Sequence, residues 1–119
     1  MPHHAKKFPV SASFLPNYYI PAIPCMRLSN QKLRRIVNNI GQAAADAHAM
    51  GIDGVYLHGH EGYLIEQLGN PAFNHRKLGR YADWRQFGLD MIKEIRRRVG
   101  PDYPHHVPHR PFACTRGNL

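Results

Sequence analysis

The 119-residue sequence is poor in cysteine, in acidic side chains and in long apolar runs. Its two cysteines, Cys25 and Cys114, lie far apart without a CxxC spacing, which argues against a disulfide framework or a zinc knuckle. The N-terminus has no apolar signal segment, and no stretch approaches the about 18 apolar residues of a membrane-spanning helix. We therefore expect a cytoplasmic protein with no membrane partner.

Acidic residues number 8 against 16 lysines and arginines, so the formal net charge is +8. Such a charge permits binding to nucleic acid or to an anionic cofactor. The basic residues, however, lie on the faces of predicted helices, at 32–35 and 96–98, and the aromatic residues are spread along the chain rather than clustered with them. We expect no nucleic-acid partner, and a non-catalytic basic binding module is kept as an alternative.

The first part of the chain, residues 1–28, contains five prolines and little periodicity, which predicts an irregular arm. A helix should follow, because apolar residues then recur every three or four positions. Ser29 or Asn30 supplies its N-cap, and Gly51 stands where a left-handed residue ends a helix. The stripe comprises Leu33, Ile36, Val37, Ile40, Ala43, Ala44 and Ala47.

The segment after this helix predicts a short strand at about 52–58, bounded by glycines. Residues 59–82 are rich in Gly, Asn and Pro and predict a long loop or short irregular helices. Asp83 and Gln86 then form a capping-box-like start for a second helix that stops at Gly100. Helix, strand, long loop and helix in this order indicate an α/β fold, and they form an excerpt from a barrel rather than a complete domain.

Another strand should follow at about 103, but the sequence there reads PHHVPHRPFACTRGNL. Proline has no amide hydrogen for a sheet ladder, so the pattern of elements breaks at this point. We therefore expect a missing strand and an irregular tail over residues 105–119.

The segment LHGHEGYL places His58, His60, Glu61 and Tyr63 just after the predicted strand. In barrels and open sheets, residues at the carboxyl ends of strands form the sites. An H-x-H pair at a strand end also suits a metal-dependent hydrolase, in which zinc activates a water. That alternative needs further ligands from other strands, so no metal ligand is assigned.

The stretch AAADAHAMGIDGVYLHGHEGYLIEQLGNPAFNHR resembles the old yellow enzyme family of FMN-dependent oxidoreductases, also called NADH:flavin oxidoreductases. These (β/α)8 barrels carry the pattern A…AGxDGVxIHxAxGYLxxQFLxPxxNxR. The resemblance covers roughly residues 10–104 and implies that 29–104 is part of a TIM barrel, about one third of it. The matching positions are Ala44, Ala47, Gly51, Asp53 to Val55, His58, Gly62 to Leu64, Gln67, Pro71, Asn74 and Arg76.

HGHEGYL and KLGRYADWRQF are most similar to the family branch of amine and betaine demethylases and dienoyl-CoA-type reductases. The YGGSxENR segment common in the family is absent, and the loop is about three residues shorter, which leaves the substrate open. The resemblance implies FMN as cofactor, NAD(P)H as an electron donor and hydride transfer between the flavin and a small organic substrate. It implies no oligomeric state.

By this resemblance, His58 and Glu61 hold the substrate over the flavin, and Tyr63 is a proton donor or a hydrogen-bonding wall. Ionised glutamate only accepts hydrogen bonds, so Glu61 favours a cationic substrate such as a methylated amine or betaine over an enone. The open alternatives are an outward-facing Glu61 and a Tyr63 packed under the loop. His60 is expected to point away from His58.

Asn74 and Arg76 are expected to brace the loop rather than touch a ligand. No cofactor-binding residue is identified, because family members draw their flavin contacts from early and late parts of the barrel. We therefore expect this chain to be an incomplete, inactive fragment with poor stability.

The tail can be encoded by codons that, read one base later, spell IMYRIDLSLALAE. This is an apolar strand with an arginine, of the kind that the resemblance leads one to expect after GPDYP. We hypothesise that residues from about 105 onward are a frameshifted tail, with a natural Pro/His-rich terminus as the alternative.

Overall fold

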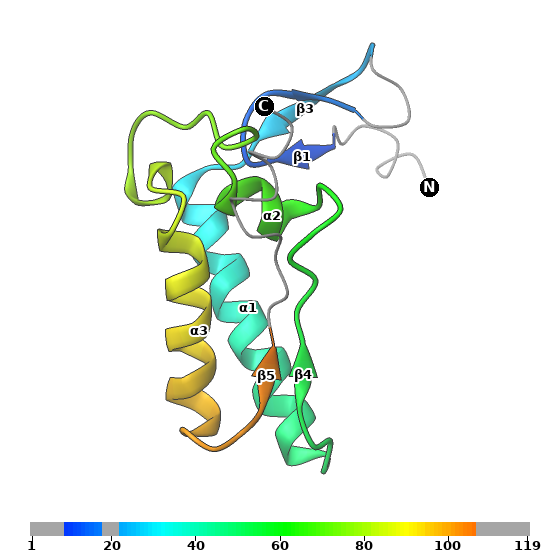
Figure 1. The fold of residues 1–119 in the computed structure, drawn as a ribbon, viewed down its shortest axis with the longest axis vertical. Coiled ribbons are helices and arrows are strands. Elements are labelled where there is room, and N and C mark those ends of the chain that lie inside the picture. The colour runs from blue at the N-terminus through cyan, green and yellow to red at the C-terminus, as the bar shows by residue number, and fades with distance from the viewer. Residues whose placement is uncertain (1–8, 18–21, 107–119) are drawn as a thin grey trace, which may run out of the picture.

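The computed structural model describes residues 9–17 and 22–106 (Figure 1). Two long helices lie side by side, a small sheet lies at one end of them, and two short parallel strands run along them. The elements are β1 (Val10–Ser11), β2 (Leu15–Pro16), β3 (Pro24–Arg27), α1 (Asn30–Ala49), β4 (Val55–Tyr56), α2 (Leu64–Gly69), the 3-10 helix η2 (Arg80–Ala82), α3 (Gln86–Val99) and β5 (His105–His106).

The N-terminal arm contains a three-stranded sheet, so the prediction of an irregular arm is wrong for these residues. Strand β3 is central: it runs parallel to β1 and antiparallel to β2. The described prolines of the arm lie at strand ends or directly beside them, where a carbonyl acceptor is enough: Pro9 precedes β1, Pro16 ends β2 and Pro24 begins β3. Pro9, for example, accepts a hydrogen bond from the Met26 amide at 2.8 Å.

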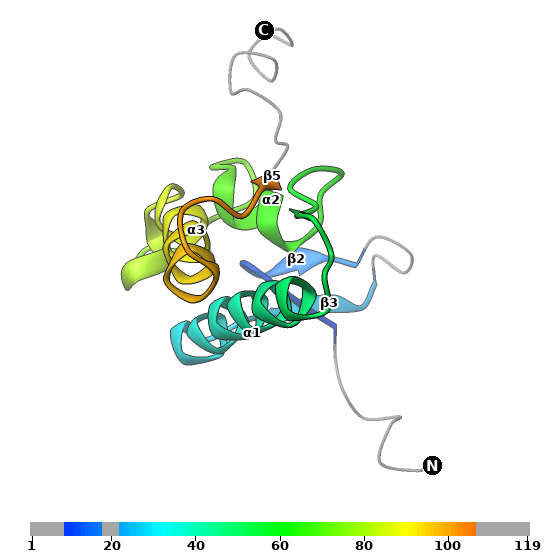
Figure 2. The ribbon, with the colours of Figure 1, turned by 90° about the horizontal axis from the view of Figure 1, so that it is seen from below.

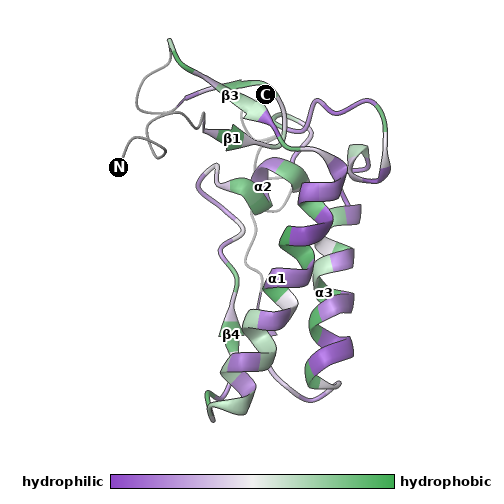
Figure 3. Cartoon of the chain, turned by 180° about the vertical axis from the view of Figure 1, so that it is seen from behind, coloured by the Kyte–Doolittle hydropathy of each residue, from purple (hydrophilic) through white to green (hydrophobic). Residues whose placement is uncertain are grey.

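Helices α1 and α3 form the core, and Figure 2 shows them side by side. Helix α1 begins as predicted, because the Ser29 hydroxyl accepts from the Lys32 amide at 3.2 Å, and Gly51 follows its end with a φ of 80°. Figure 3 shows hydrophilic residues along the outer surfaces of both helices. Their buried residues are Leu33, Val37, Gly41 and Ala44 in α1, and Phe87, Met91 and Ile95 in α3.

Helix α3 begins two residues later than the capping-box pattern predicts. Its N-cap residue is Arg85, and Asp83 instead closes a turn in which its carbonyl accepts from the Gln86 amide at 3.0 Å. The predicted capping box is wrong because the Gln86 side chain donates to Asp90, at 2.8 Å, rather than reaching back to the cap. Gly100 ends the helix as predicted, with a φ of 86°.

The strand that the sequence analysis judged to be missing is present as β5. It pairs in parallel with β4, with Val55 opposite His105 and Tyr56 opposite His106. Pro104 is tolerated because it acts as an acceptor: its carbonyl receives the Val55 amide at 3.1 Å. The prediction of an irregular tail is therefore wrong for His105 and His106, and residues 107–119 lie outside the described residues.

Strand β4 is shorter than the predicted strand at 52–58, and the long connection after it contains the predicted short helices, α2 and η2. A Cβ on Gly54 would lie 3.0 Å from the carbonyl oxygen of Pro104, so glycine permits the close pairing of the two strands. None of the helices within 9–17 and 22–106 combines the length and apolar character needed to cross a membrane.

Candidate functional site

The segment after β4 forms a sharp turn at Glu61 and Gly62. Both residues are left-handed, with φ values of 64° and 76°. Glycine adopts this conformation freely, whereas it is uncommon for glutamate. The turn is held by two hydrogen bonds: the Gly62 amide donates to the Glu66 carboxylate at 2.6 Å, and the Gln67 side chain donates to the Gly62 carbonyl at 2.7 Å.

This turn brings together all three predicted site residues, His58, Glu61 and Tyr63. One carboxylate oxygen of Glu61 lies 3.8 Å from Nε2 of His58, and the other lies 3.7 Å from Nε2 of His60. The Tyr63 ring lies 5.2 Å from the His58 ring between centroids. The end of β4 is therefore a cluster of two imidazoles, a carboxylate and a phenol.

The prediction that His60 points away from His58 is wrong, because the two rings lie 4.1 Å apart between centroids. Alternate residues of extended backbone share one face, so the H-x-H spacing itself places both rings on one side. Two further side chains of the segment are largely exposed. The Glu61 side chain is 62% exposed and faces both imidazoles, and Tyr63 is 58% exposed.

Gln67 connects this turn to the N-terminal arm. Its side-chain oxygen accepts from the Ala12 amide at 3.1 Å, while its nitrogen holds the Gly62 carbonyl. The sequence analysis assigned it no role, although it is one of the positions that match the family pattern. One side chain thus links the turn to the arm.

Asn74 and Arg76 brace the loop, as predicted, and both are buried. The Asn74 amide donates to the carbonyls of Leu68 and Tyr81, at 2.9 and 2.8 Å. The Arg76 guanidinium donates to the Ala12 carbonyl at 2.9 Å, and burial is the main cause of its lowered pKa. These contacts position the loop without occupying the end of β4.

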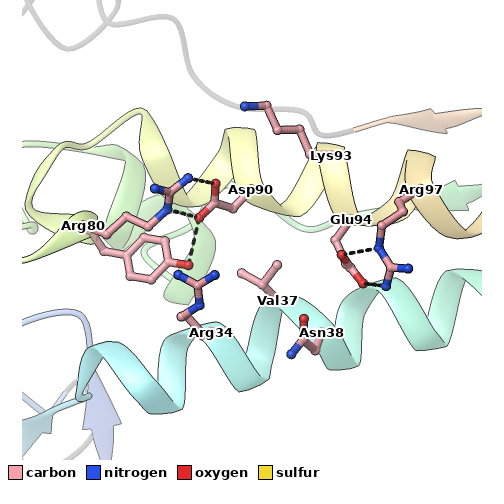
Figure 4. Close-up of a pocket in the computed structure, with 9 residues that line it drawn as sticks. Arg34, Val37, Asn38, Arg80, Asp90, Lys93, Glu94 and Arg97 are labelled. Carbon is pink, nitrogen blue, oxygen red and sulfur yellow. Dashed lines mark hydrogen bonds and ion pairs between the residues drawn. The ribbon is translucent and has the colours of Figure 1, made fainter.

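A second cluster of charges, which the sequence analysis missed, lines a groove of about 200 Å³ between α1, η2 and α3 (Figure 4). Asp90 accepts two hydrogen bonds from Arg80, at 2.6 and 2.7 Å, and one from the Tyr81 hydroxyl at 2.9 Å. The Arg80 contact holds the pKa of Asp90 well below its usual range, and burial, aided by Asp90, raises the pKa of Tyr81 to about 12.

Glu94 completes this cluster, because hydrogen bonds from Arg97 and Arg98 lower its pKa to about 2. The groove is built from other elements than the end of β4, and its acidic groups are bonded to neighbouring arginines and to Tyr81. This cluster of charges joins α1, α3 and η2, and we assign it a structural role.

The side chains at the end of β4 can bind a small polar molecule. Imidazole N–H groups and a phenol can donate to a small polar molecule, and a carboxylate can accept from one. The cluster offers no arginine or lysine for a phosphate, so no residue of this chain is assigned to hold FMN.

The chain matches the NADH:flavin oxidoreductase / NADH oxidase family over residues 8–111. It is 32% identical over 108 residues to cinnamate reductase of Clostridium sporogenes, which covers 87% of this chain and 16% of that protein. It is 35% identical over 99 residues to NADH oxidase of Thermoanaerobacter brockii, which covers 81% of this chain and 15% of that protein. The chain thus spans about one sixth of the length of these relatives.

Solved structures show the same fold. Morphinone reductase in complex with tetrahydroNAD superposes with a TM-score of 0.75 at 22% identity, over 89% of this chain and 34% of that chain. The old yellow enzyme homologue of Zymomonas mobilis gives 0.71 at 23% identity, over 87% and 32%. The likeness confirms the predicted partial (β/α)8 barrel. Because the family match runs past residue 105, the chain keeps family character there, and the frameshift stays a prediction.

Family membership favours oxidoreductase chemistry over the two alternatives, the metal-dependent hydrolase and the basic binding module. The match over residues 8–111 and the barrel-fragment fold together show that this chain belongs to the NADH:flavin oxidoreductase family of flavin-dependent enzymes.

Proposed function

We propose that this chain carries the substrate-contacting strand end of an FMN-dependent oxidoreductase, which transfers hydride between the flavin and a small organic substrate with NAD(P)H as electron donor. The observation that supports it is the convergence of His58, Glu61 and Tyr63 at the carboxyl end of β4. Because the chain spans about one sixth of its relatives, we further propose that the 119 residues alone are an inactive fragment.

When bound, FMN supplies the hydride chemistry, and the residues at this strand end orient the substrate and manage its charge. His58 donates an N–H group to the substrate atom on which negative charge develops, which is the contribution that lowers such barriers most. Tyr63, exposed beside His58, offers an O–H group as proton donor. Gln67 holds the turn through the Gly62 carbonyl, and Arg76 braces the arm beside it through the Ala12 carbonyl.

Glu61 favours a methylated amine or betaine as the substrate. Its carboxylate is exposed beside two imidazoles and can accept a hydrogen bond or attract a cation, but it cannot donate to a carbonyl oxygen. An enone is the second candidate, and the similarity to a cinnamate reductase supports it. An enone would use the His58 donor and leave Glu61 as a neighbour of the imidazoles.

The test begins with the genomic DNA on both sides of the codons for Met1 and Leu119. The polypeptide encoded together with these flanks and the 119-residue chain are purified side by side, and FMN content is measured by absorbance. We expect stoichiometric FMN and NAD(P)H-dependent turnover in the longer protein and neither in the short chain. If the flanks encode no further barrel and the short chain binds no FMN, the proposed function is wrong.

Two variants of the longer protein test the residue roles. His58→Ala should lower kcat/KM by about 10²–10³-fold, the usual effect of removing one preorganised donor. His75→Ala is the matched control, since this exposed histidine bonds the Ala72 carbonyl and lies outside the cluster. Glu61→Gln should lower the turnover of N,N-dimethylglycine but not that of cinnamate. The opposite preference would assign the enone class.

A further inference from the structure

We propose that His58, His60 and Glu61 form a binding site for a divalent transition-metal ion, of which zinc is the representative. One ligand atom from each residue takes part, and these atoms all lie within 4.8 Å of one another. The site lies in the turn after β4 and is open to solvent on one side, because the side chains of His58 and Glu61 are 42% and 62% exposed.

The geometry needs little change to hold an ion. Zinc bonds of about 2.0–2.1 Å in a tetrahedron put neighbouring ligand atoms about 3.4 Å apart. The two imidazole–carboxylate distances, 3.8 Å for His58 and 3.7 Å for His60, are already close to that value. The ligand atoms must therefore approach by about 0.3–1.4 Å, given that spacing and the 4.8 Å limit. We expect rotation of the three side chains to supply this without a change of backbone.

The donor set is suited to a borderline ion. Two neutral imidazoles and one carboxylate are the ligands of open zinc sites, which keep a water in the fourth position, and imidazole also suits copper and nickel. The carboxylate of Glu61 already faces the Nε2 atoms of both rings, with one oxygen 3.8 Å from His58 and the other 3.7 Å from His60. A dication placed there exchanges these long contacts for direct bonds to all three side chains.

The turn holds Glu61 in place for this role. Its left-handed φ of 64° is set between β4 and the Gly62 turn, which Glu66 and Gln67 secure by hydrogen bonds. In addition, Nδ1 of His60 is buried and has no hydrogen-bond partner within the described part of the chain. One nitrogen of that ring therefore has no protein partner that competes when the ring turns toward an ion.

The metal and the substrate would exclude each other, a consequence that rests on the proposed function because both use His58. Zinc would then act as an inhibitor that occupies the substrate side of the flavin site. The metal site itself depends only on three side chains of this chain, so it can be tested without flavin or substrate.

The experiment is calorimetric titration of the purified 119-residue chain with Zn²⁺ alone, in flavin-free buffer at pH 7.5, with far-UV circular dichroism as a check on folding. We expect one ion per chain at the tightest site.

His58→Ala and His60→Ala should each lower the zinc affinity of that site at least about tenfold, because even outer-shell changes cost about 10–100-fold. Glu61→Gln should weaken it as well, and it keeps a side chain of the same shape.

The matched control is the double variant His3→Ala/His4→Ala, which removes two neighbouring histidines elsewhere in the sequence. It should leave the tightest site unchanged. The proposal is overturned if Zn²⁺ binds no more tightly than to free imidazole, if the His58 and His60 variants bind like the parent chain, or if the control variant loses the site. A protein that binds zinc in this way but shows no FMN or turnover would overturn the proposed function alone.

Discussion

Replacing Arg76 with alanine should detach the N-terminal sheet from the rest of the chain. The buried guanidinium donates to the Ala12 carbonyl at 2.9 Å, to the Leu28 carbonyl at 2.6 Å and to the Asn30 side-chain oxygen at 2.7 Å. These acceptors belong to the arm, to the residue before the N-cap and to α1. One side chain thus joins the loop at residue 76 to the arm at Ala12 and to the start of α1 at Leu28 and Asn30.

The size of the stability loss follows from the hydrogen bonds that are removed and from the buried acceptors that are left without a partner. Hydrogen bonds from a charged donor contribute about 1.5–3 kcal/mol each, and a buried acceptor without a partner costs about 1–3 kcal/mol. Burying the charged guanidinium costs free energy, as its lowered pKa shows, and this cost offsets part of the stabilisation by its hydrogen bonds. The hydrogen-bond contributions therefore do not simply add. We expect a net loss of about 3 kcal/mol for Arg76→Ala, a large share of the about 5–15 kcal/mol that stabilises a typical domain.

The assay is native-state hydrogen exchange of the arm amides. The Met26 and Leu28 amides donate to the Pro9 and Ser11 carbonyls, and a loss of about 3 kcal/mol should speed their exchange about 100-fold. Amides inside α3 should change far less, because that helix packs on α1 through its own apolar stripe. Arg35→Ala, at an exposed site on α1, is the control. Equal protection of the arm amides in both variants would refute this reasoning.

Three further predictions concern the charged groove and two left-handed glycines. Asp90→Asn should lower the free energy of unfolding by about 1–2 kcal/mol at pH 7 in urea titrations. The difference in unfolding free energy between the parent chain and this variant should narrow as the pH falls from about 4 towards 2. The pKa of Asp90 is lower in the folded chain than in the unfolded one, so the stability that its carboxylate contributes is lost in acid. Tyr81, whose pKa is raised to about 12, keeps its proton longer when folded, so stability should fall between pH 10 and 12 and Tyr81→Phe should flatten that fall. Gly79→Ala should lower the urea midpoint more than Gly51→Ala, since both have positive φ but only the Cβ at Gly79 would meet the Asn30 side chain, at 2.0 Å from its nitrogen.

Local patterns account for the parts of the fold that the sequence predicts well. The stripe of α1 and the Ser29 cap depend on residues within three or four positions of each other, and Gly51 needs only its own backbone conformation. The same holds for the body of α3, in which Phe87, Met91 and Ile95 are buried. Its start was misplaced because the Gln86 side chain had a better partner, Asp90, one turn ahead.

Pairing between distant segments accounts for most of what the sequence analysis missed. The prolines around His105 were taken to exclude a strand, and the proline-rich arm was predicted to be irregular. The strands are only two to four residues long, and the Pro9 and Pro104 carbonyls accept from the Met26 and Val55 amides of the neighbouring strands. Whether a proline lies in a ladder or at its end depends on the partner strand, which a single sequence does not show. The same limit applies to Asp90, whose partner Arg80 lies ten positions earlier.

The candidate site was partly predictable from the sequence and partly not. That His58, Glu61 and Tyr63 converge was predicted through the family resemblance, whereas the orientation of His60 follows from the two-residue period of extended backbone and could have been derived from the sequence. The left-handed conformation of Glu61 could not, since glutamate rarely adopts it and Gly62 alone would have sufficed for a turn. Two consecutive left-handed residues turn the Glu61 carboxylate back towards both imidazoles, which an ordinary turn with one glycine would not do. The identity of residue 61 therefore determines whether this strand end attracts a cation, whether that cation is a substrate amine or a metal ion.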